Sequence, residues 1–163
     1  MDSPPDAPSG SAADAPKAKK PDRWRRHRTR VALVQALYQW QFSAPSTQEL
    51  EQQFASAGKL SKVDRKLFRT ALKVIMHRTA EFDELLAPVM SRSADELGKV
   101  ERGILMLGCY ELRDCEEIPF RVVISEAVEL AKSYGAEDSH KFVNAVLDRL
   151  AVTLRPIETA AAS

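Results

Sequence analysis

Apolar residues recur at intervals of three and four along almost the whole chain between residues 28 and 156, and this spacing constrains the fold more than any other feature. Such intervals place side chains on one face of an α-helix. The triplet at 122–124 is β-branched, which favours a strand, but the helical spacing continues from Val123 to Tyr134. The sequence therefore predicts an all-α fold of about seven helices with no committed strand.

Proline, glycine and capping residues divide this pattern into helices. Ser46 followed by Glu49 predicts a capping box, as does Ser93 followed by Glu96. Ser61 is expected to open the third helix, and the C-terminal part of the first is apolar on most sides, which predicts a central position. Gly98, Gly103 and Gly108 fall within the fifth helix and predict close approach of neighbouring helices. The predicted helices cover residues 28–42, 46–57, 61–77, 77–90, 93–115, 122–135 and 138–156.

The two ends of the chain differ from this helical part. Residues 1–22 hold five of the nine prolines and, after Met1, no large apolar residue, so they predict a disordered tail. Residues 157–163 predict a shorter, flexible C-terminus. Residues 23–156 then form one domain, and the apolar content of the whole chain, 44%, is enough for a core. No apolar run suits a membrane span or a secretory signal, so we expect a cytoplasmic protein with no membrane association.

Catalytic, metal and cofactor motifs are not apparent in the sequence. Glycine-rich phosphate loops and HExxH or GxSxG motifs do not occur, which argues against an enzyme. Cys109 and Cys115 are six residues apart on a predicted helix, where they point to different sides, so we expect free thiols. The three histidines are not at ligand spacing to these cysteines. We therefore expect neither a metal nor a cofactor.

Positive charge is concentrated in one short segment. Residues 17–30 carry eight basic residues and one acidic residue, whereas the whole chain has a net charge of only +1. The string RWRRHRTR, at 23–30, is expected where the tail enters the first helix, and guanidinium groups suit phosphate oxygens. The segment predicts an arm that becomes ordered on a nucleic-acid backbone, with RNA favoured over DNA. The alternative is a solvated run of charge.

A second candidate surface lies at residues 136–144. There Asp138 offers an acceptor for a base edge, Lys141 a cation for phosphate, and Phe142 a ring for stacking. The alternative is structural, with Asp138 as a helix N-cap and Phe142 in the core beside Val146. These residues by themselves favour the structural alternative.

Three strings resemble one protein family in order and spacing. They are RRHRTRVALVQALYQWQ from Arg25, VERGILMLGCYEL from Val100, and IPFRVVISEAVELAKSYGAEDSHKFVNAVLDRL from Ile118. Together they resemble the NusB family of bacterial transcription antitermination factors, from Arg25 to Pro156. The resemblance implies two packed helical bundles that act without catalysis. It also implies pairing with NusE, a small-subunit ribosomal protein, and binding to the boxA element of nascent ribosomal RNA, in a complex with NusA, NusG and RNA polymerase.

The resemblance also assigns roles to individual residues. Tyr38 and Glu101 match positions that face NusE, and Asp95 is a weaker candidate for RNA. The chain departs from the family pattern at His27, often arginine, which implies a weaker or pH-dependent phosphate contact. Ser125 and Ala145 are further departures. The residues expected to bind RNA are Arg25, Arg26, His27, Arg28, Arg30, Asp95, Asp138, Lys141 and Phe142.

Two alternatives to an RNA-binding adaptor stay open. Some RNA methyltransferases carry a NusB-like domain, but they need a cofactor-binding α/β domain downstream, which this sequence is not expected to supply. The other alternative is a homodimer in which the basic arm is covered.

Overall fold

The computed structural model describes residues 9–92 and 96–162 of the chain, with side chains placed from residue 23 onward. No strand occurs in these ranges, which confirms the predicted all-α class. The helices are α1 (Ser9–Ser43), α2 (Thr47–Ser56), α3 (Arg65–His77), α4 (Thr79–Leu86), the 3₁₀ helix η1 (Ala87–Val89), α5 (Lys99–Asp114), α6 (Phe120–Tyr134), α7 (Ser139–Leu154) and α8 (Pro156–Ala162).

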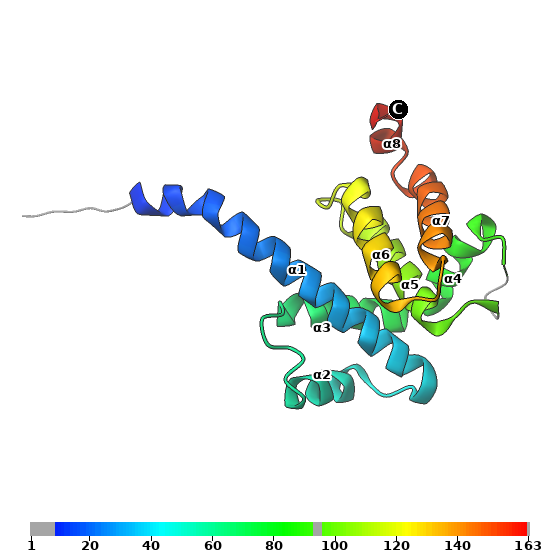
Figure 1. Ribbon diagram of the computed structural model, residues 1–163, viewed down its shortest axis with the longest axis horizontal. Helices are drawn as coiled ribbons and strands as arrows, with labels where there is room; N and C mark the ends of the chain where they lie inside the picture. The colour runs from blue at the N-terminus through cyan, green and yellow to red at the C-terminus, as the bar shows by residue number, and fades with distance from the viewer. Residues whose placement is uncertain (1–8, 93–95, 163) are drawn as a thin grey trace, which may run out of the picture.

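The helices pack as two bundles around α5. Helices α1, α2 and α3 form one bundle, and α4, α6 and α7 pack with α5 in the other. The N-terminal half of α1 projects away from both bundles (Figure 1). Among the described helices, none has the length and apolar character needed to cross a membrane.

Helix α5 forms the centre of the molecule, since it is buried on nearly every side. Its glycines allow neighbours to approach closely: a Cβ on Gly103 would lie 3.4 Å from Leu37, and one on Gly108 would lie 2.9 Å from Leu147. The predicted close approach is confirmed at Gly108, whereas at Gly103 the distance is that of ordinary van der Waals contact. Gly98 does not belong to the helix but is its N-cap.

The prediction that the end of α1 lies centrally is only half right. Ala36 and Leu37 are fully buried, but Tyr38 and Phe42 are 41% and 62% exposed. The apolar residues of this segment form two stripes, and only one of them packs on α5 and α3. The other stripe leaves aromatic rings at the surface.

Several predicted boundaries require correction. The capping box of Ser46 and Glu49 is confirmed. The third helix, however, is capped by Asp64 rather than Ser61, because the Asp64 carboxylate accepts a hydrogen bond from the Leu67 amide at 3.1 Å. The fifth helix begins at Lys99, whereas Ser93, its predicted cap, lies outside the described residues.

Both ends of the described chain are helical. Helix α1 extends back to Ser9, into a stretch rich in alanine and lysine, residues of high helix propensity. At the other end, Glu158 accepts a hydrogen bond from the Phe120 amide at 2.9 Å and fixes α8 to the start of α6. The division of the chain at residues 22 and 156 remains a prediction.

Candidate nucleic-acid interface

The arginine-rich segment lies within α1, not at its N-terminus as predicted. Its residues therefore divide between two faces of one helix. Arg23, Arg25, Arg26 and Arg28 are exposed, whereas Arg30 is only 5% exposed. The exposed arginines surround this part of α1: Arg23 and Arg26 line one groove together with Arg30, whereas Arg25 and Arg28 lie on other sides of the helix.

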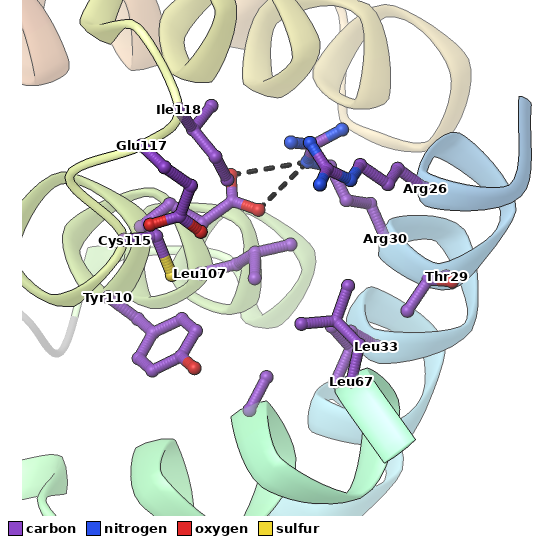
Figure 2. Close-up of a pocket in the computed structure, with 12 residues that line it drawn as sticks. Arg26, Thr29, Arg30, Leu33, Leu67, Leu107, Tyr110, Cys115, Glu117 and Ile118 are labelled. Atoms are coloured by element: carbon purple, nitrogen blue, oxygen red, sulfur yellow. Dashed lines mark hydrogen bonds and ion pairs between the residues drawn. The ribbon is translucent and has the colours of Figure 1, made fainter. Parts of the chain in front are cut away.

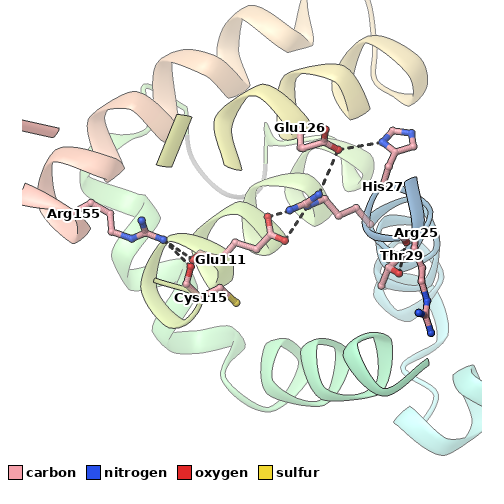
Figure 3. A network of polar contacts seen from close by, with 8 residues as sticks. Arg25, His27, Thr29, Glu111, Cys115, Glu126 and Arg155 are labelled. Carbon is pink, nitrogen blue, oxygen red and sulfur yellow. Dashed lines mark hydrogen bonds and ion pairs between the residues drawn. The ribbon is translucent and has the colours of Figure 1, made fainter. Parts of the chain in front are cut away.

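Arg30 is held by two carboxylates of the second bundle, those of Glu111 and Glu126. Both glutamates belong to the polar network shown in Figure 3. Its Nε donates to both Glu111 oxygens, at 2.9 and 3.2 Å, and its Nη1 lies 3.5 Å from Glu126 Oε1. Burial raises the pKa of Glu111, while the charge and hydrogen bonds of Arg30 act in the opposite direction. Arg30 thus joins α1 to α5 and α6, and its donors face protein rather than solvent.

His27 is the second residue of the segment that is engaged with protein. Its Nδ1 lies 3.1 Å from Glu126 Oε1, the same oxygen that Arg30 approaches. The histidine that replaces a frequent arginine in the family pattern therefore has a carboxylate partner within the molecule.

A small cavity separates this polar network from the core (Figure 2). Arg26, Arg30 and Tyr110 are among its lining residues, and its volume is about 40 Å³. Ligand pockets begin at about 300 Å³, so this cavity does not accommodate a nucleotide. In the described part of the chain, no three His, Cys, Asp or Glu residues are grouped to hold a metal.

Asp138 occupies the N-cap position of α7 in a left-handed conformation, with φ of 66°. Its side chain makes no capping hydrogen bond but lies 3.4 Å from Lys141 Nζ, and both side chains are largely exposed. The structural alternative for Asp138 therefore holds for its backbone only. Its carboxylate and the Lys141 ammonium are presented to solvent.

Phe142 is partly buried against the core, and its ring is covered on one side by Arg92. The Arg92 guanidinium lies 4.4 Å from the ring centroid. Stacking of a base on this side of Phe142 would require Arg92 to move. Asp95 lies outside the described residues, so its predicted role is left as a prediction.

Tyr134, at the end of α6, connects the two predicted surfaces. It is 45% exposed and lines a groove of about 350 Å³ together with His27 and Arg28. The loop to Asp138 follows directly after it. The segment 134–138 therefore lies beside the arginine-rich part of α1 at one end and leads into α7 at the other.

A second groove, of about 430 Å³, surrounds the predicted NusE contact at Tyr38. The rings of Tyr38 and Phe42 are 5.0 Å apart between centroids, and Tyr134 and Val100 are among the other apolar residues that line the groove. Exposed aromatic residues gathered in a groove are typical of protein-binding surfaces.

Glu101 is not exposed beside Tyr38 as a partner contact would be. It is 8% exposed, and its Oε2 accepts a hydrogen bond from the Ala136 amide at 2.9 Å. In the isolated chain it positions the loop between α6 and α7. The structure therefore brings Val100, rather than Glu101, to the groove surface.

Sequence reasoning missed three residues of these surfaces. No surface role was predicted for Trp24, which stands in the basic string, for Tyr134, which marked only the end of a helix, or for Arg92. The position of Trp24 within a run of arginines is a signal that could have been read from the sequence. The positions of Tyr134 and Arg92 depend on contacts between helices that are far apart in sequence.

Comparison with known proteins identifies the family. The NusB family model matches residues 27–152. The chain belongs to the NusB family. The transcription antitermination protein NusB of Serratia proteamaculans is 48% identical over 130 residues, which cover 80% of this chain and 94% of that protein. The Yersinia pestis NusB protein is 47% identical with the same coverage.

Solved structures of NusB proteins share the fold. The T. maritima NusB structure has a TM-score of 0.68 at 36% identity and covers 77% of this chain and 89% of that chain. A crystal structure of the antitermination factors NusB and NusE in complex with double-stranded RNA has a TM-score of 0.70 at 26% identity. It covers 80% of this chain and 98% of that chain.

Proposed function

We propose that this chain is a transcription antitermination factor that pairs with NusE and binds boxA of nascent ribosomal RNA, without catalysing a reaction. The observation that carries this proposal is the match to NusB proteins over most of their length. A structurally similar NusB has been crystallised with NusE and RNA, which supports both partners.

The geometry supports a division of the surface between RNA and protein. For RNA we propose the exposed arginines Arg25, Arg26 and Arg28, together with Asp138, Lys141 and Phe142 near the start of α7. His27 and Arg30 join them only if their contacts with Glu126 and Glu111 are released. For NusE we propose the groove that contains Tyr38, with Glu101 supporting the loop beside it.

A titration of boxA RNA tests this function. The RNA is added to the chain alone, to NusE alone and to the equimolar mixture, with a scrambled RNA of equal length as control. We expect the mixture to bind boxA tighter than either protein does, because two phosphate-binding surfaces act on one strand. Equal affinity of the mixture for the scrambled RNA would contradict the proposal.

The partner surface has its own test. Tyr38→Ala removes an exposed ring from the groove and is expected to weaken NusE binding while RNA binding by the chain alone is retained. Val152→Ala, on an exposed position of α7, is the matched control. Calorimetric titration of NusE into each variant measures the effect, and equal affinities for both variants would place NusE elsewhere.

Assembly with NusA, NusG and RNA polymerase is the further step that we propose for the NusE–RNA complex. In the absence of NusE, we propose that the resting form is a homodimer. Analytical ultracentrifugation with and without NusE distinguishes a monomer from a dimer that NusE dissociates.

A further inference from the structure

A groove beside the arginine-rich segment has no role in the function proposed above. It lies between α1 and α6, has a volume of about 580 Å³, and is lined by Arg23, Trp24, His27, Glu126, Glu129 and Ser133. This volume falls within the range of about 300 to 1,000 Å³ in which ligand pockets occur. The groove is thus large enough for a nucleobase.

Two helical stripes form its walls. On α1, Trp24 precedes His27 by three residues, so the two lie on one face. On α6, Glu126, Glu129 and Ser133 follow at intervals of three and four, which also places them on one face. The His27–Glu126 contact of 3.1 Å joins the two stripes at one end of the groove.

Trp24 offers a free aromatic surface in this groove. Its ring meets His27 edge-on, with centroids 6.3 Å apart and an interplanar angle of 90°. The tryptophan is nevertheless 64% exposed. Because His27 is itself held by Glu126, the contact orients the indole while most of its surface stays open to solvent.

The two carboxylates of the groove differ in their partners. Glu126 is engaged by His27 and Arg30. Glu129 is exposed and has no hydrogen bond or ion pair with any described residue. A free carboxylate repels phosphate and accepts hydrogen bonds only, so the ligand group that meets Glu129 must be a donor. The phosphates of the same strand are drawn to the exposed arginines on the adjoining face of α1.

We propose that this groove binds one unpaired guanine base of the RNA, stacked on Trp24 and hydrogen-bonded to Glu129; this inference rests on the proposed RNA binding. Guanine presents two adjacent donors, N1–H and N2–H, which match the two oxygens of a carboxylate. Cytosine and adenine present one exocyclic amino group, and the N3–H of uracil lies between two carbonyl oxygens. The carboxylate therefore favours guanine and disfavours uracil.

Fluorescence anisotropy with single-stranded RNAs tests the proposal. One probe is a uridine strand of about 12 nucleotides, and the other carries a single internal guanosine. Wild-type protein is expected to bind the guanosine probe about tenfold tighter, because a matched polar contact to a base edge gives discrimination of that order. Trp24→Ala is expected to weaken binding of the guanosine probe about tenfold, whereas Trp24→Phe retains most of the affinity.

Intrinsic fluorescence assigns the contact to Trp24. The guanosine probe is expected to quench wild-type emission but not that of Trp24→Phe, in which Trp40 is the remaining tryptophan. Glu129→Gln is expected to reduce the preference for guanosine without weakening binding of the uridine strand. Glu84→Gln, an exposed carboxylate on α4, is the matched control and should leave both affinities unchanged.

The outcomes separate this inference from the proposed function. If Trp24→Ala and Glu129→Gln bind both probes as wild type does, the guanine site is overturned while RNA binding through the arginines stands. Equal wild-type affinity for the two probes would likewise overturn it. If wild type binds boxA RNA with NusE but neither probe, the guanine site alone is overturned. If it binds no RNA, boxA included, the proposed function is overturned as well.

Discussion

Arg28 and Arg30 are two residues apart on α1 and have opposite surroundings. Arg30 is buried against Glu111, while Arg28 is exposed. Arg30→Met is expected to lower the free energy of unfolding by about 3 kcal/mol, because it leaves a buried carboxylate without its partner. Urea unfolding followed by circular dichroism measures this change.

Arg28→Met is the matched control for that substitution. It is expected to change stability by less than about 0.5 kcal/mol, as exposed substitutions usually do, but to weaken RNA binding. If both variants unfold at the same urea concentration as wild type, the contact between Arg30 and Glu111 does not stabilise the fold.

Cys109 and Cys115 are free and buried, and burial raises the pKa of their thiols to about 12 and about 11 from an ordinary value of 9.0. A raised pKa leaves almost no thiolate at pH 8, and only the thiolate is alkylated. Iodoacetamide is expected to label the native protein about a hundredfold more slowly than the urea-unfolded protein, or slower still, because raising the pKa from 9.0 to about 11 or about 12 lowers the thiolate fraction by that factor. Equal rates, measured by mass spectrometry, would show that the thiols are accessible.

At the scale of the helices, the tight loop between α6 and α7 depends on the absence of a side chain at Gly135. A Cβ at this position would contact Ser139 Oγ, and it would lie 2.8 Å from the Ala131 carbonyl oxygen and 3.0 Å from Glu101 Oε2. Because the Ala131 oxygen belongs to the backbone, relief requires the loop itself to shift. Gly135→Ala is expected to cost about 2 kcal/mol of stability in thermal or urea unfolding.

Gly103→Ala is the matched control for this effect. There the nearest atom, Leu37 Cβ, lies at 3.4 Å, and alanine favours the helix by about 1 kcal/mol relative to glycine. We expect Gly103→Ala to be at least as stable as wild type. A greater loss at Gly103 than at Gly135 would mean that the packing of α1 on α5 is the tighter of the two.

At the scale of the whole molecule, the modest net charge of +1 conceals a basic surface. Four exposed arginines lie along the segment 23–28, and the fifth, Arg30, is buried. Four phosphate contacts to a single strand predict a slope of roughly −3 in a plot of log affinity against log salt concentration. RNA titrations at several salt concentrations measure the slope, and Arg28→Ala should make it about 0.7 shallower. A slope near zero would contradict phosphate binding by this surface.

The sequence by itself determined the helical class, most helix positions, the capping box at Ser46 and the concentration of arginines in one segment. These are local properties, set by spacing of three and four residues and by the identity of capping groups. The family motifs predicted NusE and boxA RNA as partners.

Only the tertiary structure decided which arginines face solvent, and which residues of the segment are held by carboxylates. Arg30 meets Glu111 across 81 residues and His27 meets Glu126 across 99, so no local pattern reports these contacts. The same holds for Tyr38, whose apolar stripe suggested a core position. Burial depends on which helix packs on which face, and that is settled by the assembly of all helices together.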